Sequence, residues 1–296
     1  MTTLRPLDRR SVLVVMISIF GLGFQQVAVK LALPEISGLV QAALRSAGAA
    51  IVIVAILAWR EPGWTRSDGT LWPGVASAVL FGCEFIALYL GLEYTSASHA
   101  AMFLYTHVFF TALGLIVVMP GERLRALQWA GLVLSFVGVA LALRVSGVVS
   151  TTMLLGDCLA LAGGFFWAMT TLVVKTTALR TASPLKILLY QLAGSAVILA
   201  VAAFARGETL PASVSALAIG SMLYQTLFSV VVCFSIWFWL LARYRAGEVA
   251  SFTFLTPVVG VLAGWWVLGE PVAASFAIAV AMVAAGILLV NWPARA

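Results

Sequence analysis

The chain alternates between long apolar runs and short stretches that contain charges, glycine or proline. The runs are close to the roughly 20 helical residues that cross a hydrocarbon core of about 30 Å. None of them resembles a strand, and in lipid only helices and closed barrels satisfy the backbone. The pattern predicts an all-α polytopic membrane protein with ten transmembrane helices. The expected helices cover about residues 11–32, 36–59, 70–92, 96–119, 124–143, 152–175, 184–204, 213–241, 247–268 and 271–292.

The composition favours lipid over water as the main surroundings of the chain. Of its 296 residues, 63% are hydrophobic and 9% are charged, and the mean hydropathy is +1.10. A soluble domain carries roughly 25% charged residues. Ten membrane crossings use roughly 200 residues, so only short loops remain and a separate soluble domain is excluded.

Lysine and arginine are distributed unevenly among the segments that lie between the expected helices. Counted in order, the odd-numbered segments contain Arg5, Arg9, Arg10, Arg60, Arg66, Arg123, Arg125, Lys175, Arg180, Lys186, Arg243, Arg245 and Arg295. The even-numbered segments contain only Lys30, Arg144 and Arg206. The positive-inside rule then places both termini in the cytoplasm. This asymmetry explains the net charge of +6, and the scattered basic residues argue against nucleic acid as a partner.

The second half of the chain repeats features of the first. A shift of 150 positions aligns the third and fourth expected helices with the eighth and ninth. The residues matched at this shift are Leu90 with Leu240, Tyr94 with Tyr244, Ala100 with Ala250, Thr106 with Thr256, and Gly114 with Gly264. At nearby shifts, the turn after each helix pair carries Gly-Glu (Gly121–Glu122 and Gly269–Glu270), and Val29–Lys30 at the start of the first half matches Val174–Lys175. Because five helices per half is an odd number, the halves must cross the membrane in opposite directions. We expect two inverted five-helix repeats, residues 1–146 and 147–296.

Inverted repeats are typical of secondary transporters, in which the solute site lies between the halves near the middle of the membrane. Two equivalent halves can exchange conformations and so open one site to either side in turn. The repeat therefore predicts both a class of protein and a mechanism, alternating access.

Several stretches resemble the EamA repeat, two copies of which form a ten-helix member of the drug/metabolite transporter superfamily. They are Gly23-Phe24-Gln25-Gln26-Val27-Ala28-Val29-Lys30, Arg45, Tyr94-Thr95-Ser96-Ala97-Ser98, Thr256-Pro257 and Leu268-Gly269-Glu270. Glu84 in the third helix resembles a glutamate of the YddG-type amino-acid exporters. This resemblance implies efflux of aromatic and other neutral amino acids across the cytoplasmic (inner) membrane of a bacterium. Leu22 and His107 depart from the family's tryptophan and proline, which Trp167 and Pro257 keep in the second half.

Polar residues inside the bilayer are costly and are candidates for function by default. Glu84 lies roughly 12 Å from the outer end of its helix, and His107 lies roughly 16 Å deep on the next helix. We expect this pair to bind a substrate ammonium or to relay a proton. The alternative is a static hydrogen bond that joins the two helices.

Arg45 is the one basic residue near the middle of an expected helix. A guanidinium can bind a carboxylate with two donors. Because the family pattern has an arginine here for diverse cargo, the resemblance favours a structural role, in which Arg45 bonds helix carbonyls or Glu84.

Other polar and aromatic side chains are candidates to line the solute path. Gln25, Gln26 and Trp167 occupy matching stretches of the first and sixth helices, and the two glutamines point about 100° apart. Bonds between helices are the alternative role for the two glutamines. Six further aromatic candidates for an apolar part of the cavity are Tyr89, Phe103, Tyr105, Tyr224, Trp237 and Trp239. For each of them, helix packing or lipid contact is the alternative.

Other classes of function fit less well. The chain has no G-x-x-x-x-G-K-[ST] loop for ATP. An intramembrane enzyme would require clustered acidic residues or histidines, whereas Glu84, His99, His107 and Asp157 are sparse, so we expect no metal and no cofactor. The chain lacks the rings of charged residues that are typical of a channel. A broad drug or metabolite exporter of the same fold remains an alternative. The expected partners are a small solute and lipid, and ten helices suffice to enclose one site in a monomer.

Overall fold

The computed structural model describes residues 8–61, 63–65, 68–118, 124–244 and 252–292, and every element in this part of the chain is helical. Eight apolar helical segments are long enough to cross a membrane, and two shorter apolar helices follow, Phe252–Leu268 and Ala274–Val290. These ten segments follow the order of the ten predicted helices, so the chain is an all-helical, multi-pass membrane protein.

Three of the ten segments are divided into two or more helices, and a fourth begins with a short 3-10 turn. The first half contains α1 (Arg9–Gly23), α2 (Gln25–Ala32), α3 (Gly38–Arg60), α4 (Leu71–Tyr94), α5 (Ala97–Leu104), α6 (His107–Val118) and α7 (Ala126–Val149). The second half contains α8 (Thr151–Thr176), η1 (Ala178–Thr181), α9 (Pro184–Ala205), α10 (Ala216–Leu223), η2 (Tyr224–Cys233), α11 (Phe234–Arg243), η3 (Phe252–Phe254), α13 (Leu255–Leu268) and α14 (Ala274–Val290).

Short polar side chains determine where several helices begin. A serine hydroxyl accepts a backbone N–H bond at the start of α5, α8, α9 and α10. Such a cap satisfies one of the unpaired N–H groups in the first turn. The serines are Ser96, Ser150, Ser183 and Ser215. A local feature of the sequence therefore determines where each of these helices begins.

The last membrane helix is shorter than expected, whereas the expected start of the ninth, residue 247, lies outside the described residues. Gly269 ends α13 in the left-handed conformation, with φ of 66°, which glycine adopts without a steric penalty. The next helix begins only at Ala274, because Pro271, Val272 and Ala273 lie outside regular helix. The expected start of α14 at residue 271 is therefore three residues too early.

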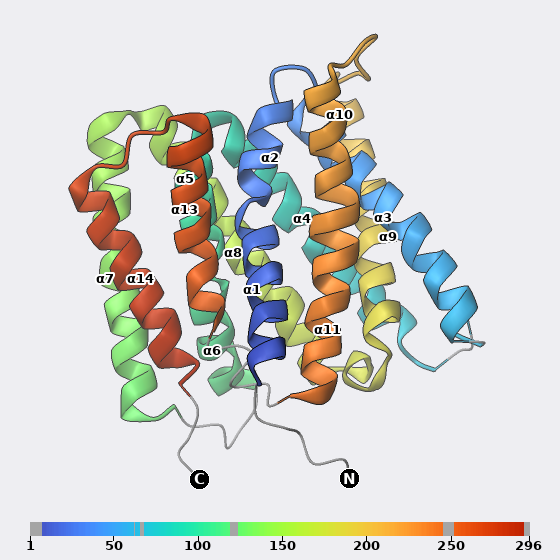
Figure 1. The fold of residues 1–296 in the computed structure, drawn as a ribbon. Coiled ribbons are helices and arrows are strands. Elements are labelled where there is room, and N and C mark those ends of the chain that lie inside the picture. The colour runs from blue at the N-terminus through green and yellow to red at the C-terminus, as the bar shows by residue number, and fades with distance from the viewer. Residues whose placement is uncertain (1–7, 62, 66–67, 119–123, 245–251, 293–296) are drawn as a thin grey trace.

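The helices form a bundle with a pair at each of two opposite edges. Figure 1 shows α7 beside α14 at one edge and α3 beside α9 at the other, and both pairs are in extensive contact. Glycine permits the close approach of α7 and α14, because a side chain on Gly131 would meet the carbonyl of Gly286. The remaining segments lie between the edge pairs and surround the interior. They are α1/α2, α4, α5/α6, α8, α10 to α11 and α13.

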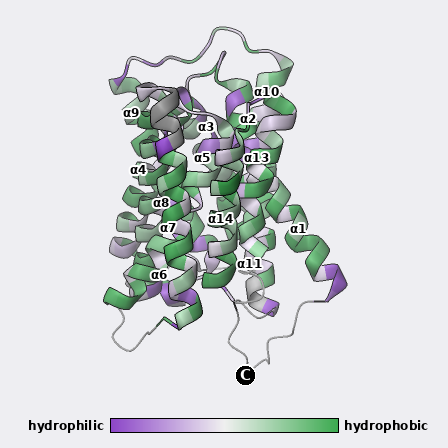
Figure 2. Ribbon diagram, turned by 90° about the vertical axis from the view of Figure 1, so that its left-hand side faces the viewer, coloured by the Kyte–Doolittle hydropathy of each residue, from purple (hydrophilic) through white to green (hydrophobic). Residues whose placement is uncertain are grey.

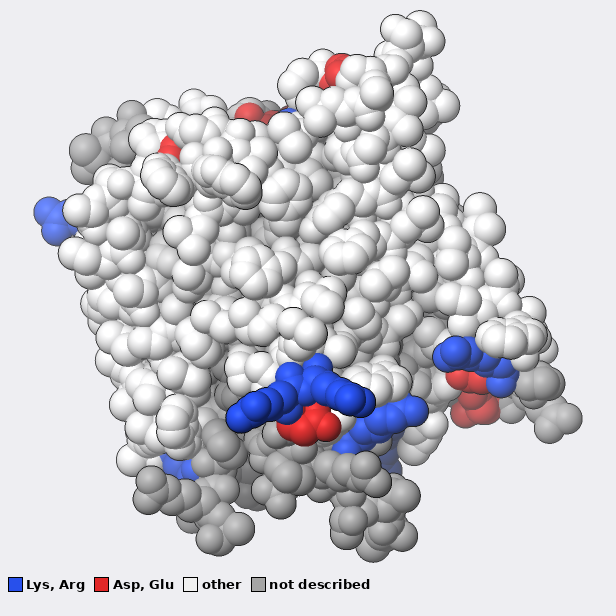
Figure 3. All heavy atoms as spheres, viewed as in Figure 1, with Lys and Arg blue, Asp and Glu red and all other residues white. Residues whose placement is uncertain are grey.

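The outer surface of the bundle is apolar between its two ends. Figure 2 shows hydrophobic positions along the helices and hydrophilic ones mainly near their ends, and Figure 3 shows a face whose charges lie near those ends. Phe204 and Trp266 are 86% and 81% exposed. Such an extended apolar surface suits lipid and would aggregate in water. Helix α1 begins and α14 ends at the same end of the bundle (Figure 1).

Three of the expected continuous helices are interrupted inside the bundle. The first changes direction at Phe24, between α1 and α2, and the fourth breaks at Tyr105 and Thr106, between α5 and α6. The eighth contains a π-helix, Tyr224–Cys233, whose backbone hydrogen bonds span one more residue than those of an α-helix. Broken helices and π-helices are frequent at functional sites, because they present backbone and side chains that a regular helix hides.

Helix α5 is fixed at its start by the other half of the chain. The Glu270 carboxylate accepts the backbone N–H groups of Ala97 at 2.7 Å and Ser98 at 2.9 Å, and the Ser98 hydroxyl at 2.5 Å. The predicted Gly-Glu turn of the second half thus caps a helix of the first. Its predicted counterpart, Gly121–Glu122, lies outside the described residues.

Candidate functional site

The interrupted helices meet around a small internal cavity of about 30 Å³. Its lining residues come from six of the membrane segments. They are Leu22, Gln25, Gln26, Arg45, Phe81, Glu84, Phe85, Leu104, Tyr105, Trp167, Val230 and Phe234. This volume is close to that of one water molecule, so the cavity is closed around a space smaller than any organic solute.

Two side chains that carry opposite charges when ionised face this cavity. Arg45 is 1% exposed and Glu84 is 2% exposed. Nε and Nη2 of Arg45 and Oε2 of Glu84 have no protein hydrogen-bond partner, and no ion pair joins the two described side chains. Unpaired polar groups in an apolar interior cost several kcal/mol, so such groups usually meet a partner during function. The cavity therefore offers one cation and one anion to a solute.

Aromatic rings hold the guanidinium of Arg45. Its Cζ lies 3.8 Å from the centre of the Phe85 ring and 5.7 Å from that of Tyr89. A cation over a ring face gains roughly 0.5–2 kcal/mol, more when it is desolvated. The expected structural bonds to helix carbonyls are not made by Nε or Nη2, so the fixed contacts of this end of Arg45 are aromatic.

Gln25 and Gln26 both line the cavity, but they are held differently. The Gln25 carbonyl accepts the Ser229 hydroxyl at 2.6 Å, which ties α2 to the π-helix. Oε1 of Gln26 has no protein partner. Of the two predicted glutamines, Gln26 is thus the one that keeps an acceptor unpaired beside the cavity.

His107 lies behind the cavity and is separated from Glu84. Its ring stacks on Trp167, with centroids 3.8 Å apart and planes 15° apart, and Trp167 itself lines the cavity. No hydrogen bond joins the described side chains of His107 and Glu84, and Nδ1 of His107 has no partner. The structure connects the two predicted residues through Trp167 and Tyr105, whose rings contact that of His107 and which both line the cavity.

Five other predicted residues lie outside the cavity lining, among them exposed Trp239. The Tyr89 hydroxyl donates to Gln225 at 2.9 Å, and the Tyr224 hydroxyl donates to the Gly21 carbonyl at 2.8 Å. Phe103 is fully buried in the main hydrophobic core, and Trp237 packs in a smaller cluster around Val15, Ile19 and Leu240. These aromatic side chains pack helices together around the site.

A buried polar network beside the cavity was not foreseen from the sequence. Gln225 receives the Tyr89 hydroxyl and donates to Gln41 at 3.0 Å and to Ser221 at 3.1 Å. Ser221 in turn donates to the carbonyl of Ala28. Glutamine inside an apolar run was the available signal, because amides are uncommon in such surroundings. The network links α2, α3, α4, α10 and the π-helix.

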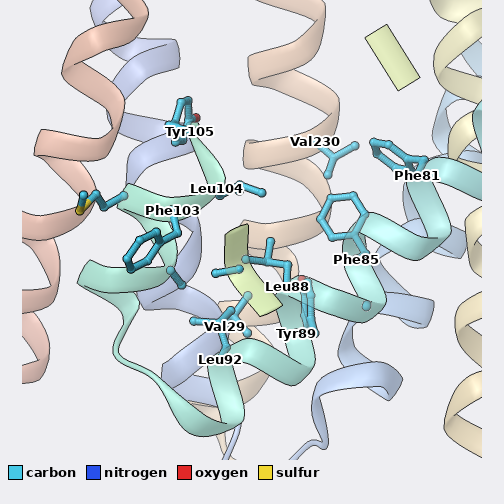
Figure 4. Close-up of a cluster of buried hydrophobic side chains, with 14 of the residues drawn as sticks. Val29, Phe81, Phe85, Leu88, Tyr89, Leu92, Phe103, Leu104, Tyr105 and Val230 are labelled. Carbon is cyan, nitrogen blue, oxygen red and sulfur yellow. The ribbon is translucent and has the colours of Figure 1, made fainter. Parts of the chain in front are cut away.

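Tyr105 and Trp167 were expected near the cavity, but the phenylalanine part of its apolar wall was missed. Phe81 and Phe85 lie edge to face with centroids 4.7 Å apart, and Figure 4 shows them close to Val230. Leu104 and Tyr105, at the end of α5, form another part of the wall (Figure 4). A phenylalanine in an apolar run carries no distinguishing pattern, so only the fold reveals which ones face the interior.

Comparisons with known proteins identify a family and relatives for nearly the whole chain. A model of the EamA-like transporter family matches it twice, over residues 9–144 and 154–292. The "Uncharacterized transporter YvbV" of Bacillus subtilis (strain 168) is 28% identical over 215 residues, which cover 71% of this chain and 70% of that protein. A "Probable amino-acid metabolite efflux pump" of Salmonella typhimurium (strain LT2) is 28% identical over 263 residues, which cover 85% and 84%.

The fold is also similar to that of a protein of known crystal structure. The TM-score is 0.68 with 17% sequence identity, and the match covers 96% of each chain. At this identity the likeness concerns the fold alone.

Proposed function

Because the chain belongs to the EamA-like transporter family of the drug/metabolite transporter superfamily, we propose that it exports neutral amino acids, aromatic ones included, from the bacterial cytoplasm. The transport is secondary and proceeds by alternating access at the internal cavity. The family and the names of the relatives indicate a transporter rather than an enzyme. In the described part of the chain, no group of three or more histidine, cysteine, aspartate or glutamate side chains could hold a metal ion.

The choice of substrate class rests on one observation: Arg45 and Glu84 face the same cavity. An amino acid presents an ammonium and a carboxylate, and these match the two side chains in charge. The rings of Phe81, Phe85 and Trp167 offer an apolar surface to its side chain. The name of the Salmonella relative supports the same class of cargo.

Contacts between the helices support an inverted repeat, residues 1–146 and 147–296. A two-fold axis that exchanges the halves maps each membrane segment onto the one five places later. In agreement, three segments pack on their own counterparts: α3 on α9, α5 on α13 and α7 on α14. The contact of α4 with α8 is matched by the equivalent contact of α10 with α2. The lysine and arginine distribution supports placing both termini in the cytoplasm.

Transport requires the cavity to widen. About 30 Å³ holds a water molecule but no amino acid, so the described conformation is closed around the site. The breaks at Phe24 and Tyr105 and the π-helix line or adjoin the cavity. Bending at these points opens the site to one side and then to the other while most helices move as rigid bodies.

The proposal predicts that Glu84→Gln removes recognition of the substrate amine. We expect uptake of labelled phenylalanine into proteoliposomes to fall about tenfold or more, because the loss of a buried charged partner costs over 1.4 kcal/mol. In competition assays, 3-phenylpropionate, which lacks the amine, should then inhibit the variant as well as phenylalanine does. Glu93→Gln, on the same helix but paired with exposed Arg206, is the matched control and should retain wild-type uptake.

A wild-type uptake rate and wild-type preference for phenylalanine in Glu84→Gln would remove Glu84 from the substrate site. The broader drug or metabolite exporter would be favoured instead if lipophilic cations, but no amino acids, competed for uptake. The aromatic walls of Phe81, Phe85 and Trp167 are the feature that suits such cargo.

A further inference from the structure

The polar atoms around the closed cavity bear on how the transport cycle is completed. Four atoms of its lining side chains have no hydrogen-bond partner among the described residues: Nε and Nη2 of Arg45, Oε2 of Glu84 and Oε1 of Gln26. The side chains of these three residues belong to residues that are only 1%, 2% and 2% exposed. The closed conformation thus buries donors and acceptors that the protein itself does not pair.

Water inside the closed cavity is a poor partner for these atoms. All four are enclosed by protein atoms and have almost no surface that a water molecule could touch. The volume of about 30 Å³ admits water, but Figure 4 shows that Phe81, Phe85 and Leu104 present carbon to it. A buried water needs roughly two to four polar partners. Closure therefore removes the hydration of Arg45 and Glu84 without replacing it.

Neighbouring contacts keep the unpaired side chains from pairing with one another. The guanidinium of Arg45 is held over the ring of Phe85, with Cζ 3.8 Å from the ring centre. Gln25, next to Gln26 in α2, accepts the Ser229 hydroxyl at 2.6 Å, which fixes this turn of the helix. The missing hydrogen bonds are thus left to a solute.

The open conformations differ from the closed one in this respect. When the site is open to either side, water solvates Arg45, Glu84 and Gln26, and no cargo is needed. Closing without cargo strips off this water and leaves the polar atoms unpaired. Closing around an amino acid replaces the water by an ammonium and a carboxylate. The loaded carrier therefore passes through the closed conformation faster than the unloaded one.

We propose that the protein is an exchanger of zwitterionic amino acids, because it closes readily only around cargo. This inference rests on the proposed function, in which Arg45 and Glu84 receive the carboxylate and the ammonium. The carrier then returns from the outside with a second amino acid far more often than without one. Export of one amino acid is thus coupled to entry of another solute that bears both charged groups.

Efflux from proteoliposomes into two media tests this inference in the wild type. Vesicles are loaded with labelled phenylalanine and diluted into buffer alone or into buffer with saturating unlabelled phenylalanine. We expect the label to leave at least about tenfold faster into the second medium, because even one buried unpaired polar group slows unloaded closure by this order. External 3-phenylpropionate, which lacks the ammonium, should not accelerate efflux.

Gln26→Leu tests the cause of the coupling. The substitution removes one unpaired acceptor and leaves Arg45 and Glu84 in place, so unloaded closure becomes easier. We expect the ratio of exchange to net efflux, measured at saturating phenylalanine, to fall about fivefold or more. A role in packing alone does not predict this direction, because a packing defect slows both rates.

Gln191→Leu is the matched control for this substitution. Gln191 is also a glutamine inside a membrane helix, but it lies outside the cavity lining and its amide donates to the Ser77 hydroxyl at 3.1 Å. This variant should keep the wild-type ratio of exchange to net efflux.

The outcomes separate the exchange from the proposed function. Equal efflux of label into the two media would overturn the exchange and leave amino-acid transport standing. A ratio that is unchanged or higher in Gln26→Leu would show that the unpaired atoms do not control closure, which also overturns the inference. No efflux into either medium, with label retained as in protein-free vesicles, would overturn the proposed function and the exchange with it.

Discussion

Arg45 and Glu84 show how single residues can be selected as candidates for function from physical cost. Each sits in an apolar run, where an ionisable side chain is expensive and must be compensated. For Arg45 part of the compensation is the face of Phe85, at 3.8 Å, and the remaining donors point to a role that is completed by a solute. The sequence could therefore identify these two residues.

The partners of these residues could not be identified in the same way. Phe81 and Phe85 line the cavity because of how α4 is turned, and many other aromatic residues have the same local pattern. Conversely, Trp237 was a plausible candidate, yet it packs against Val15 and Ile19 outside the cavity. Side-chain direction depends on tertiary packing, which a periodic pattern in a uniformly apolar helix does not encode.

Asp68 provides a prediction at the residue scale, outside the membrane segments. Lys186 at 2.8 Å and the Thr70 hydroxyl hold the pKa of Asp68 at about 2, below its usual 3.8. A lowered pKa in the folded state stabilises the fold above pH 3.8, and this contribution is lost as the pH falls towards about 2. Asp68→Asn should therefore lower the Tm at neutral pH in detergent.

The Tm difference between wild type and Asp68→Asn should shrink as the pH falls through that window. Glu61→Gln is the control, because Glu61 forms no ion pair with a described residue. A Tm difference that is constant down to about pH 2 would show that the ion pair with Lys186 is not its cause.

Secondary-structure elements were predictable in number and order, but their interruptions were not. Apolar length alone indicates a membrane helix. The break after α5, in contrast, depends on contacts with another element. Gly164 of α8 packs against the carbonyls of Phe103 and Leu104, and the Thr106 hydroxyl bonds the Phe103 carbonyl at 2.6 Å. Similarly, the Gly21 carbonyl, near the end of α1, accepts the hydroxyl of Tyr224.

Gly164→Ala tests the importance of the break between α5 and α6. A Cβ on Gly164 would lie 2.8 Å from the Leu104 carbonyl and 3.0 Å from that of Phe103, so backbone next to the cavity must shift. We expect a loss of about 1–3 kcal/mol in stability and a clear loss of phenylalanine uptake. Gly220→Ala is the matched control, because a Cβ there meets no atom within 4 Å.

Helix propensity predicts that Gly220→Ala keeps or slightly raises the Tm, by the equivalent of up to about 1 kcal/mol. Equal Tm values and equal uptake for Gly164→Ala and the wild type would show that close packing against Leu104 does not support the site.

At the scale of the whole molecule, the match of the family model to both halves agrees with the repeat read from the sequence. Odd-numbered halves imply that α1 begins and α14 ends at one end of the bundle, as Figure 1 shows. The closed cavity and the length of the last helix were not predictable, because they depend on how the halves pack in one conformation. The boundary between residues 146 and 147 stays a prediction.

Membrane orientation is testable by thiol labelling of intact bacterial cells. In a variant without Cys83, Cys158 and Cys233, we expect a cysteine at Ala212 to react with an impermeant maleimide from outside. A cysteine at Thr65 should react only after permeabilisation, because the loop between α3 and α4 belongs to the arginine-rich side. The opposite pattern of labelling would invert the proposed topology.

Solute counterflow tests the central claim, that one cavity alternates between the two sides, most directly. Proteoliposomes are loaded with unlabelled phenylalanine and diluted into a trace of labelled phenylalanine. A carrier produces a transient accumulation of label above equilibrium, because each inward step is followed by return with unlabelled solute. Label that never exceeds the level in protein-free liposomes, or that emerges as a changed compound, would contradict transport by alternating access.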